Sequence, residues 1–438
     1  MDVYKKRIGV AADDTTGAND IGIMFAKAGY RSCVLPLESA DKSDAEGMDV
    51  IIIDTNSRLD TPQDAAAKVR RATKLLQSLP CDVYHKKTCS VFRGNIGAEF
   101  DAMQEVLGVD CSMVVLGFPK NGRTTIGGIH YLNGQLLEDS QFAQDPIHPA
   151  DTSVLADIIR KQSKKSVGNI TVADLDRGLC FVCGRMETLR RQNAYIVFDV
   201  RDQQDLWLIA QAIKEEPSLC GSSAIGEELP RAYNEGMPFT NGIKSLLHPV
   251  EDACGVLLLS GSLTVQTRSQ IAYLRQLGCK AWEFDTDSVF DEEALKEHIA
   301  EAVAFGAAHL KEGRDVLIHT ANEPEAVQRT KERAYAHGWN DEAVGKRISG
   351  SMCAVAEQIF EQTGGRKLVV AGGDTSAAVA KGLRVKKMVI LEEIEPGVPT
   401  MYGDTPKGEL LMVLKSGSFG SDSFLQQSIE ALKALQDG

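Results

Sequence analysis

Short apolar runs rich in β-branched residues recur along the chain, and stretches with the period of an amphipathic helix separate them. In the first half the predicted strands are Ile8–Ala12, Ser32–Leu35, Val50–Ile53, Val83–His85, Met113–Leu116 and Tyr195–Val200. The predicted helices between them include Asn19–Ala28, Gln63–Leu76 and Glu99–Leu107. Helical crossovers of this length favour a doubly wound, mainly parallel sheet.

A second series of the same kind follows a polar segment between about Leu229 and Asp252. That segment has no clean period and carries Pro230, Pro238, Gly242 and Pro249. The strands predicted after it are Gly255–Leu259, Trp282–Phe284, Val316–His319, Leu368–Ala371, Met388–Leu391 and Leu411–Leu414, with helices such as Val265–Leu277 and Glu293–His309. The predicted fold is therefore two tandem α/β domains with mainly parallel sheets flanked by helices, over residues 1–240 and 250–438.

Length, composition and charge limit the classes of protein to which this chain can belong. The 438 residues, 43% hydrophobic and 25% charged, suit two folded domains rather than one small core or a disordered chain. A formal net charge of −13 would repel a nucleic-acid backbone, and no apolar stretch is long enough to span a membrane. The first residues lack the apolar segment of a secretory signal, so the cytoplasm is the expected location.

Cysteine and histidine do not point to a metal site. The ten cysteines are scattered, mostly in apolar runs, which is typical of reduced core thiols rather than of a disulfide framework. Cys180 and Cys183 form a Cys-x-x-Cys pair, but a structural zinc site would need a second pair or a His pair nearby. The histidines lack ligand spacing, and His148 is the one whose surroundings are most worth following.

Small residues follow three predicted strands of the second half. These loops are Ser260-Gly261-Ser262, Gly372-Gly373-Asp374-Thr375-Ser376 and Ser416-Gly417-Ser418-Phe419-Gly420, each before a helix-like stretch. Glycine lets backbone amides approach an anion closely, and a helix N-terminus favours negative charge. One such loop is usually only a turn, but three in one domain predict a site for the phosphates of a nucleotide.

Charged residues occupy the same positions in the first half. They are Asp13 and Asp14, Asn56-Ser57-Arg58, Lys86-Lys87 continuing to Arg93-Gly94-Asn95, and Lys120-Asn121-Gly122-Arg123. Ligands of open α/β sheets bind beyond the carboxyl ends of the strands. Basic groups suit a carboxylate, and carboxylates and amides suit hydroxyls, so a small polyhydroxy acid fits such a pocket. The alternative is that these residues are solvated loop ends with ordinary surface ion pairs.

The adjacent acids Asp13 and Asp14 begin a strand-to-helix turn. Thr15, Thr16 or Asn19 could cap the helix, which explains the hydroxyls and the amide but not two acids in succession. An aspartate can accept the proton of the attacking hydroxyl in phosphoryl transfer. We assign this catalytic role to Asp14.

Other catalytic motifs are absent from the sequence. There is no Gly-x4-Gly-Lys-Ser/Thr loop, no protein-kinase His-Arg-Asp set, no Gly-x-Ser-x-Gly elbow and no His-Glu-x-x-His pair. No Gly-x-Gly-x-x-Gly follows the first strand, which disfavours a nicotinamide-dependent dehydrogenase.

Seven short segments occur in one order along nearly the whole chain: Ala12-Asp13-Asp14-x-Thr16-Gly17-Ala18, Arg93-Gly94-Asn95-Ile96-Gly97, Phe118-Pro119-x-x-Gly122-Arg123-Thr124, Asp145-Pro146-Ile147-His148-Pro149, Ala371-Gly372-Gly373-Asp374-Thr375-Ser376, Pro396-Gly397-Val398-Pro399 and Lys415-Ser416-Gly417-Ser418-Phe419-Gly420. Together they resemble the four-carbon acid sugar kinase family, whose members phosphorylate compounds such as threonate, erythronate and 3-oxo-tetronate with ATP. The resemblance implies a sugar-acid-binding N-terminal domain and a nucleotide-binding C-terminal domain.

The resemblance also implies roles for single residues. The residues expected to contact substrate are Asp13, Asp14, Arg58, Lys87, Ser90, Arg93 and Asn95. The residues expected to contact nucleotide are Ser260, Gly261, Gly372, Gly373, Asp374, Thr375, Ser376, Gly417 and Gly420. Arg58 and Lys87 would take up the substrate carboxylate, and Mg²⁺ would bridge the phosphates.

The expected reaction transfers the γ-phosphoryl group of ATP to the 4-hydroxyl of an acid of the threonate or erythronate type. The domains would close over both substrates to exclude water. A kinase for 3-oxo-tetronate or for a longer acid is the alternative within enzymes, and a non-catalytic sensor that binds sugar acid and nucleotide is the alternative outside them. The expected partners are these small molecules, with neither nucleic acid nor membrane, and a homo-oligomer is left open.

One segment departs from the family pattern. Where many members read Lys-x-Asp-Ser-Thr before Arg-Gly-Asn or Lys-Gly-Asn, this chain has Lys87-Thr88-Cys89-Ser90-Val91-Phe92. Cys89 replaces a hydrogen-bond acceptor and Val91 replaces a hydroxyl. Either the preferred acid differs from that of other members, or these two side chains are not ligands.

Overall fold

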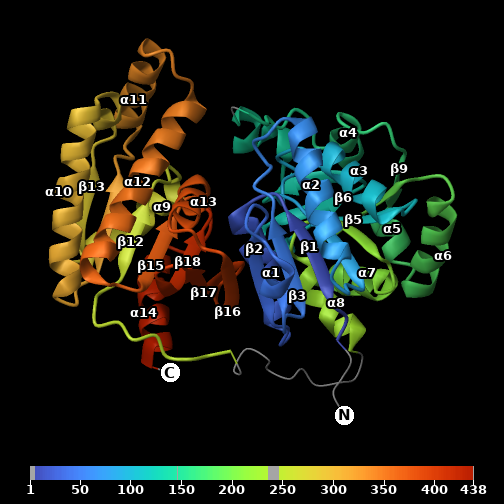
Figure 1. Ribbon diagram of the computed structural model, residues 1–438. Coiled ribbons are helices and arrows are strands. Elements are labelled where there is room, and N and C mark those ends of the chain that lie inside the picture. The colour runs from blue at the N-terminus through green and yellow to red at the C-terminus, as the bar shows by residue number, and fades with distance from the viewer. Residues whose placement is uncertain (1–4, 146, 235–245, 438) are drawn as a thin grey trace. The chain divides into compact units, whose positions relative to one another are not determined.

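The computed structural model describes residues 5–145, 147–234 and 246–437 (Figure 1). The chain divides into two compact units, residues 1–243 and 244–438. Pro146, Pro238 and Gly242, which the sequence analysis singled out, lie outside the described residues. Pro230, assigned to the polar boundary segment, lies instead inside a helix that continues to Tyr233. The prediction of where the first domain loses regular structure was therefore too early by a few residues.

The N-terminal unit is built on one parallel sheet with the strand order β2-β3-β1-β4-β11-β5-β10-β9. The strands are β1 (Ile8–Ala12), β2 (Ser32–Pro36), β3 (Val50–Asp54), β4 (Val83–Lys87), β5 (Ser112–Val115), β9 (Val167–Ile170), β10 (Tyr195–Phe198) and β11 (Ser218–Gly221). Its central strands are buried because helices cover both faces, which is why they read as continuous apolar runs.

Two groups of helices flank this sheet (Figure 1). The helices are α1 (Thr15–Ala26), α2 (Pro62–Gln77), α3 (Ile96–Leu107), α4 (Leu155–Arg160), α5 (Val172–Leu175), α6 (Leu179–Arg190), α7 (Gln203–Ile213) and α8 (Ile225–Tyr233). One group packs in the order α1, α8, α7, α6, and the other in the order α2, α3, α4. The crossover β1-α1-β2 runs one way along the sheet and β3-α2-β4 runs the other way, so right-handed connections place the two groups on opposite faces.

A small antiparallel sheet, which the sequence analysis did not predict, follows β5. Its strands are β6 (Arg123–Ile126), β7 (Ile129–Leu132) and β8 (Gln135–Leu136), and the 3₁₀ turn η2 (Pro119–Asn121) precedes it. Asp199 at the end of β10 fixes its hairpin turn by accepting hydrogen bonds from the amides of Gly127 (2.6 Å) and Gly128 (2.8 Å). His130 on β7 joins the hairpin to the loop after β4, because Nε2 lies 2.9 Å from the carbonyl oxygen of Ser90.

The C-terminal unit repeats the α/β plan with the strand order β13-β14-β12-β15-β18-β17-β16. The strands are β12 (Leu257–Ser260), β13 (Lys280–Phe284), β14 (Val316–Thr320), β15 (Lys367–Ala371), β16 (Lys387–Glu395), β17 (Val398–Thr405) and β18 (Gly408–Lys415). The helices are α9 (Val265–Gln276), α10 (Glu292–Lys311), α11 (Pro324–Ala336), α12 (Asp341–Thr363), α13 (Gly373–Gly382) and α14 (Phe424–Asp437). Five neighbouring strands, in the order β13, β14, β12, β15 and β18, pair in parallel, whereas β17 runs antiparallel to its neighbours β18 and β16. The prediction of a mainly parallel α/β fold is confirmed.

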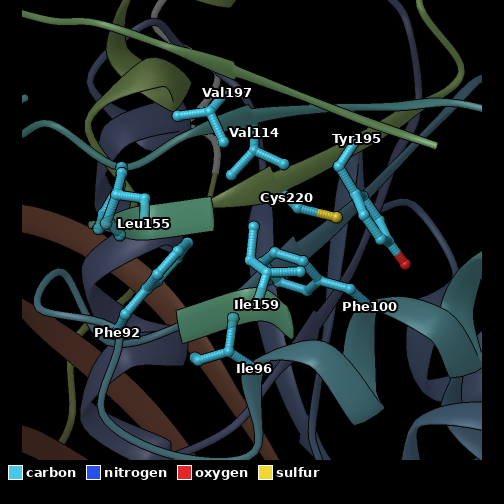
Figure 2. Close-up of a cluster of buried hydrophobic side chains, with 10 residues drawn as sticks. Phe92, Ile96, Phe100, Val114, Leu155, Ile159, Tyr195, Val197 and Cys220 are labelled. Atoms are coloured by element: carbon cyan, nitrogen blue, oxygen red, sulfur yellow. The ribbon is translucent and has the colours of Figure 1, made fainter. Parts of the chain in front are cut away.

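An aromatic cluster in the N-terminal unit supports the loop that follows β4 (Figure 2). The Phe92 and Phe100 rings meet edge to face with centroids 5.9 Å apart, and Phe100 lies 5.8 Å from the Tyr195 ring. Phe92 is 5% exposed although its φ is +51°, a strained value for a large side chain. Burying this ring therefore fixes the loop from which Arg93 and Asn95 extend.

Gly221, the last residue of β11, lies where the neighbouring strand leaves no room for a side chain. Its φ is +130°, and a Cβ there would lie 2.0 Å from the carbonyl oxygen of Val115 on the neighbouring strand. We expect Gly221→Ala to lower the free energy of unfolding by at least about 2 kcal/mol. Gly184→Ala is the matched control: Gly184 lies in α6 with no atom within 4 Å of the added Cβ, so this variant should gain about 0.5–1 kcal/mol. Urea unfolding measures both, and equal stabilities would contradict the argument.

Candidate functional site

Three charged loops meet at the carboxyl edge of the N-terminal sheet. β1 lies between β3 and β4, and its last residue Ala12 pairs with Asp54 on one side and Lys87 on the other. The segments that follow these strands must therefore emerge side by side. The topology thus brings together Asp13, Asp14, Arg58 and Lys87, as predicted from the sequence.

The Arg58 guanidinium binds both adjacent aspartates. Nε and Nη2 each donate to Asp13 at 2.9 Å, and Nη1 and Nη2 donate to Asp14 at 2.7 and 2.6 Å. These bonds use four of the five N–H donors of arginine. The Arg58 side chain is 11% exposed, that of Asp13 1% and that of Asp14 17%. Asp14 is therefore the most exposed member of this group.

The backbone of Arg58 is held from several directions. His148 Nε2 lies 2.7 Å from the Arg58 carbonyl oxygen. Asn95 Nδ2 donates to the carbonyl oxygens of Ser57 (3.2 Å) and Asp60 (2.9 Å), on both sides of Arg58. Asn95 is 1% exposed, so its side chain serves this loop rather than facing the open end of the site.

Burial and charge act in opposite directions on the acids of this site. Burial would raise the pKa of Asp13, but Arg58, Lys86 and Lys87 outweigh it and lower the pKa to about 2. Burial raises the pKa of Asp54 to about 6 despite the hydrogen bond that Thr15 Oγ1 donates to it at 2.5 Å. Burial also raises the pKa of Asp20. Asp13 thus stays ionised at neutral pH, as its pairing with Arg58 requires.

Asp14 is itself the N-cap of α1, whereas the sequence analysis considered only Thr15, Thr16 and Asn19 for that position. Its Oδ1 accepts from the Gly17 amide at 3.0 Å, and its Oδ2 accepts from Thr16 Oγ1 at 2.9 Å. A Cβ on Gly17 would lie 2.3 Å from Asp14 Oδ1, so this position requires glycine. Aspartate is a preferred N-cap, and capping alone accounts for one of the two acids.

Two adjacent lysines at the end of β4 differ in their partners. Lys86 is fully buried and pairs with the equally buried Glu99 at 3.0 Å. Lys87 donates to the Thr88 carbonyl oxygen at 3.0 Å and lies 3.6 Å from Asp20 Oδ2. Lys86, Glu99 and Asp20 were not among the predicted site residues. Lys86 directly follows the predicted strand Val83–His85, and this position was the signal that could have identified it, whereas Asp20 and Glu99 lie within helices and carried no such signal.

The loop after β4 borders a cavity of about 240 Å³. Arg93, Gly94 and His148 line it, and Arg93 Nη1 donates to Asp145 at 3.1 Å. A Cβ on Gly94 would lie 3.5 Å from Asp13 Oδ2, so this glycine stands between the cavity and the acid pair. The carbonyl oxygen of Ser90 faces His130, and this is the only hydrogen bond found for Ser90 among the described residues.

The two departures from the family pattern differ in environment. Val91 is 4% exposed and therefore a core residue. Cys89 is half-buried and lies near Arg58 and Arg123. Cys89 thus faces the site, whereas Val91 does not.

In the C-terminal unit the three predicted loops are packed on one another through glycine. A Cβ on Gly261 would lie 2.2 Å from Thr375 Oγ1, one on Gly372 3.2 Å from the Ser262 amide nitrogen, and one on Gly417 2.3 Å from Ser262 Oγ. Gly372 precedes α13 with φ +123°, and Gly373 begins that helix with open space around it. Gly372 to Ser376 therefore form a helix N-terminus that an anion can approach.

Buried polar side chains hold the last of these loops. Lys415 is fully buried, and its Nζ donates to Thr267 Oγ1 and to the carbonyl oxygens of Ser416 and Gly417, each at 3.0 Å. Thr264 Oγ1 donates to the same Gly417 oxygen at 2.6 Å. With these carbonyl groups turned toward Lys415, the loop keeps its amides for a ligand.

The remaining predicted nucleotide residues differ in exposure. Ser260, Thr375 and Ser376 are buried, and the Ser260 hydroxyl has no hydrogen-bond partner among the described residues. Asp374 is exposed in the first turn of α13. Gly420 has φ +86° and packs against Phe424. The loops thus offer both free amides and an exposed carboxylate.

The described residues contain no group of three or more His, Cys, Asp or Glu side chains arranged to hold a metal ion. No helix in the part of the chain that the structure describes is long and apolar enough to cross a membrane. All ten cysteines are free thiols, and Cys180 is exposed while Cys183 is half-buried.

Comparison with known proteins follows the division into two units. Residues 8–229 match the model of a sugar-binding N-terminal domain, and residues 257–425 match that of a nucleotide-binding C-terminal domain. The chain is 31% identical to a 3-oxo-tetronate kinase of Burkholderia multivorans, with 97% of each chain covered. It is 30% identical to a D-threonate kinase of Salmonella typhimurium, covering 98% of this chain and 99% of the relative. It is also 30% identical to a D-erythronate kinase of Heliobacterium modesticaldum, with 88% of each covered.

Two solved structures share the fold. One, from Salmonella typhimurium LT2, matches with a TM-score of 0.83 at 24% identity over 96% of this chain and 98% of that chain. The other, from Haemophilus influenzae, gives a TM-score of 0.75 at 24% identity over 97% of this chain and 100% of that chain.

Lys415 provides a test of the nucleotide loops. Lys415→Met removes the ammonium group that holds two loop carbonyls, so nucleotide affinity should fall about 10- to 100-fold. Burial lowers the pKa of Lys415 to about 7, so the ammonium form is present below that pH and is lost as pH rises through it. Wild-type affinity should accordingly fall between about pH 6 and pH 8 more steeply than that of the variant.

Titration calorimetry with ATP measures both effects. The control is Lys433→Met, which removes a lysine paired at the surface with Asp315 and should leave affinity and its pH profile unchanged. Equal affinity of wild type and Lys415→Met across this pH range would contradict the role given to Lys415.

Proposed function

The chain belongs to the four-carbon acid sugar kinase family, and from this membership we propose the acceptor, the phosphoryl position and the residues of its reaction. It is an ATP-using phosphotransferase that acts on a hydroxyl of a four-carbon sugar acid. The proposed product carries the phosphoryl group on the 4-hydroxyl. The observation that carries this proposal is Asp14, a carboxylate fixed at the end of β1 by Arg58 and the most exposed of the three side chains in that group.

The acceptor side of the reaction is assigned to the N-terminal unit. Asp14 accepts the hydrogen bond of the substrate hydroxyl and either orients it or takes its proton. Lys87, at 2.9 Å from a Cβ position on Gly17, stands at the same helix start and places positive charge beside the acceptor. Arg58 and Asp13 keep Asp14 in place, so they act as positioning residues. Ser90 and Arg93 are proposed contacts for the rest of the substrate.

The donor side is assigned to the C-terminal unit. The amides of residues 372–376 and 417–420 fit the phosphates of ATP, because glycine leaves the backbone open and α13 directs its N-terminus at them. Asp374 fits Mg²⁺, a cation that commonly uses one or two carboxylates together with substrate phosphates. When bound, Mg²⁺ neutralises charge that develops on the phosphates.

The preferred acid is proposed to be of the threonate or erythronate type. A 3-oxo-tetronate is the second candidate, favoured by several relatives of that name, including the one that is 31% identical over 97% of both chains. Both candidates share the carboxylate and the terminal hydroxyl, and they differ at carbon 3. The half-buried Cys89 is the residue of the substrate loop that could respond to that difference.

Acid-dependent formation of ADP tests the proposed function. The purified protein is given ATP, Mg²⁺ and each stereoisomer of threonate and erythronate, and separately 3-oxo-tetronate. We expect at least one acid to raise ADP formation far above the rate with water alone. ADP formation that no acid stimulates would refute the proposal, and tight binding without turnover would favour a sensor.

Asp14→Asn tests the catalytic residue. Asparagine caps a helix as well as aspartate does, so the fold should persist, whereas turnover should fall at least about 100-fold because the proton acceptor is lost. Asp41→Asn is the matched control, since Asp41 also caps a helix, the 3₁₀ turn Lys42–Ala45, and is exposed elsewhere. Rates are compared after thermal unfolding shows that both variants are folded. Wild-type turnover by Asp14→Asn would remove Asp14 from the mechanism.

A further inference from the structure

Arg123 differs from the other basic residues at the open end of the N-terminal sheet. Each of the others has a carboxylate partner: Arg58 with Asp13 and Asp14, Lys86 with Glu99, Lys87 with Asp20, Arg93 with Asp145, and Lys120 with Glu227. Arg123 forms no ion pair with any of the residues that the structure describes. Its charge therefore has no carboxylate partner within residues 5–145, 147–234 and 246–437.

The guanidinium of Arg123 is poorly satisfied. Nη1 donates to the carbonyl oxygen of Asn121, while Nε is buried and has no hydrogen-bond partner in the part of the chain that the structure describes. Burial lowers the pKa of Arg123, which is the mark of a cation held away from water without full compensation. A half-buried charge of this kind costs free energy when it has no partner, and an anion placed beside it would offset that cost.

The backbone places Arg123 firmly at the site. Its amide and carbonyl both bond to Phe118, at 3.0 and 2.8 Å, and Phe118 is 2% exposed. The hairpin that Arg123 begins is tied to the Ser90 carbonyl oxygen by His130. The charge of Arg123 interacts with Cys89 and with Asp20, and Asp20 in turn lies 3.6 Å from Lys87. Arg123 therefore belongs to the same group of side chains as the proposed substrate residues.

We propose that Arg123 binds the carboxylate of the sugar acid, so that it fixes the end of the substrate opposite to the reacting hydroxyl. A carboxylate is planar and offers two oxygens to the guanidinium fork. Arg58, the residue first considered for this role, has four of its donors engaged by Asp13 and Asp14. This inference rests on the proposed function, because it names how that substrate is recognised.

Kinetics of Arg123→Gln test this assignment. With the best acid, KM should rise at least about 30-fold while kcat changes little, because a contact made equally in the bound and transition states is lost. The four-carbon polyol that lacks the carboxylate should be used equally poorly by both forms. Arg70→Gln, which removes an exposed arginine paired with Glu105, should keep wild-type values.

Thermal unfolding gives a readout that does not require turnover. The acid should raise the unfolding temperature of the wild type and not that of Arg123→Gln. Without ligand, the variant should be at least as stable as the wild type, because it lacks a half-buried charge that has no ion pair among the described residues. If Arg123→Gln fails to fold, Arg123→Lys keeps the charge without the fork and should raise KM about tenfold.

The outcomes separate this inference from the function on which it rests. If the wild type phosphorylates an acid and Arg123→Gln or Arg123→Lys keeps its KM, the inference is overturned and the function stands. A thermal shift that survives in Arg123→Gln also overturns it. If the wild type phosphorylates no acid, the proposed function is refuted, while an acid-induced shift that depends on Arg123 would still support a carboxylate site.

Discussion

A single guanidinium, that of Arg58, holds two adjacent carboxylates at the end of β1, and the geometry of the N-terminal site depends on it. Without Arg58 the buried Asp13 would lose both of its close hydrogen bonds, and such a loss typically costs about 3–5 kcal/mol. Neighbouring residues support this contact. Gly94 leaves room for the Arg58 side chain, and Asn95 and His148 fix the backbone around Arg58. Asp14 can therefore offer an oriented carboxylate to a ligand at little entropic cost.

Each unit uses one cationic side chain to hold neighbouring groups in place, but the groups that are held differ. In the N-terminal unit the cation Arg58 holds acidic side chains, so that the site presents charge to a small acceptor. In the C-terminal unit the cation Lys415 holds backbone carbonyls, so that the loop presents its amides. Charged loops in one unit and glycine loops in the other are thus two ways to preorganise groups for phosphoryl transfer.

The periodicity of the sequence identified the main strands because a parallel sheet covered on both faces needs continuous apolar runs. It did not identify β11, whose four residues include Ser218 and Gly221, or the hairpin that carries Arg123. The rule that ligands bind at the carboxyl ends of strands predicted a site there, and the structure brings Asp13, Asp14, Arg58 and Lys87 together at that edge of the sheet. The sequence could not show which charged residues form ion pairs, because partners such as Arg58 and Asp13 lie 45 positions apart and meet only in the folded protein. The burial of the Asn95 side chain and the lack of an ion pair at Arg123 among the described residues also depend on tertiary structure.

The central claim is that the terminal hydroxyl, and not the carboxylate, receives the phosphoryl group, because Asp14 holds the first and a separate cation holds the second. Phosphorus and carbon NMR of the product decides this most directly. The account predicts a phosphate ester at the 4-hydroxyl that is stable to hydroxylamine. An acyl phosphate that hydroxylamine cleaves, or an ester at the 2- or 3-position, would contradict it.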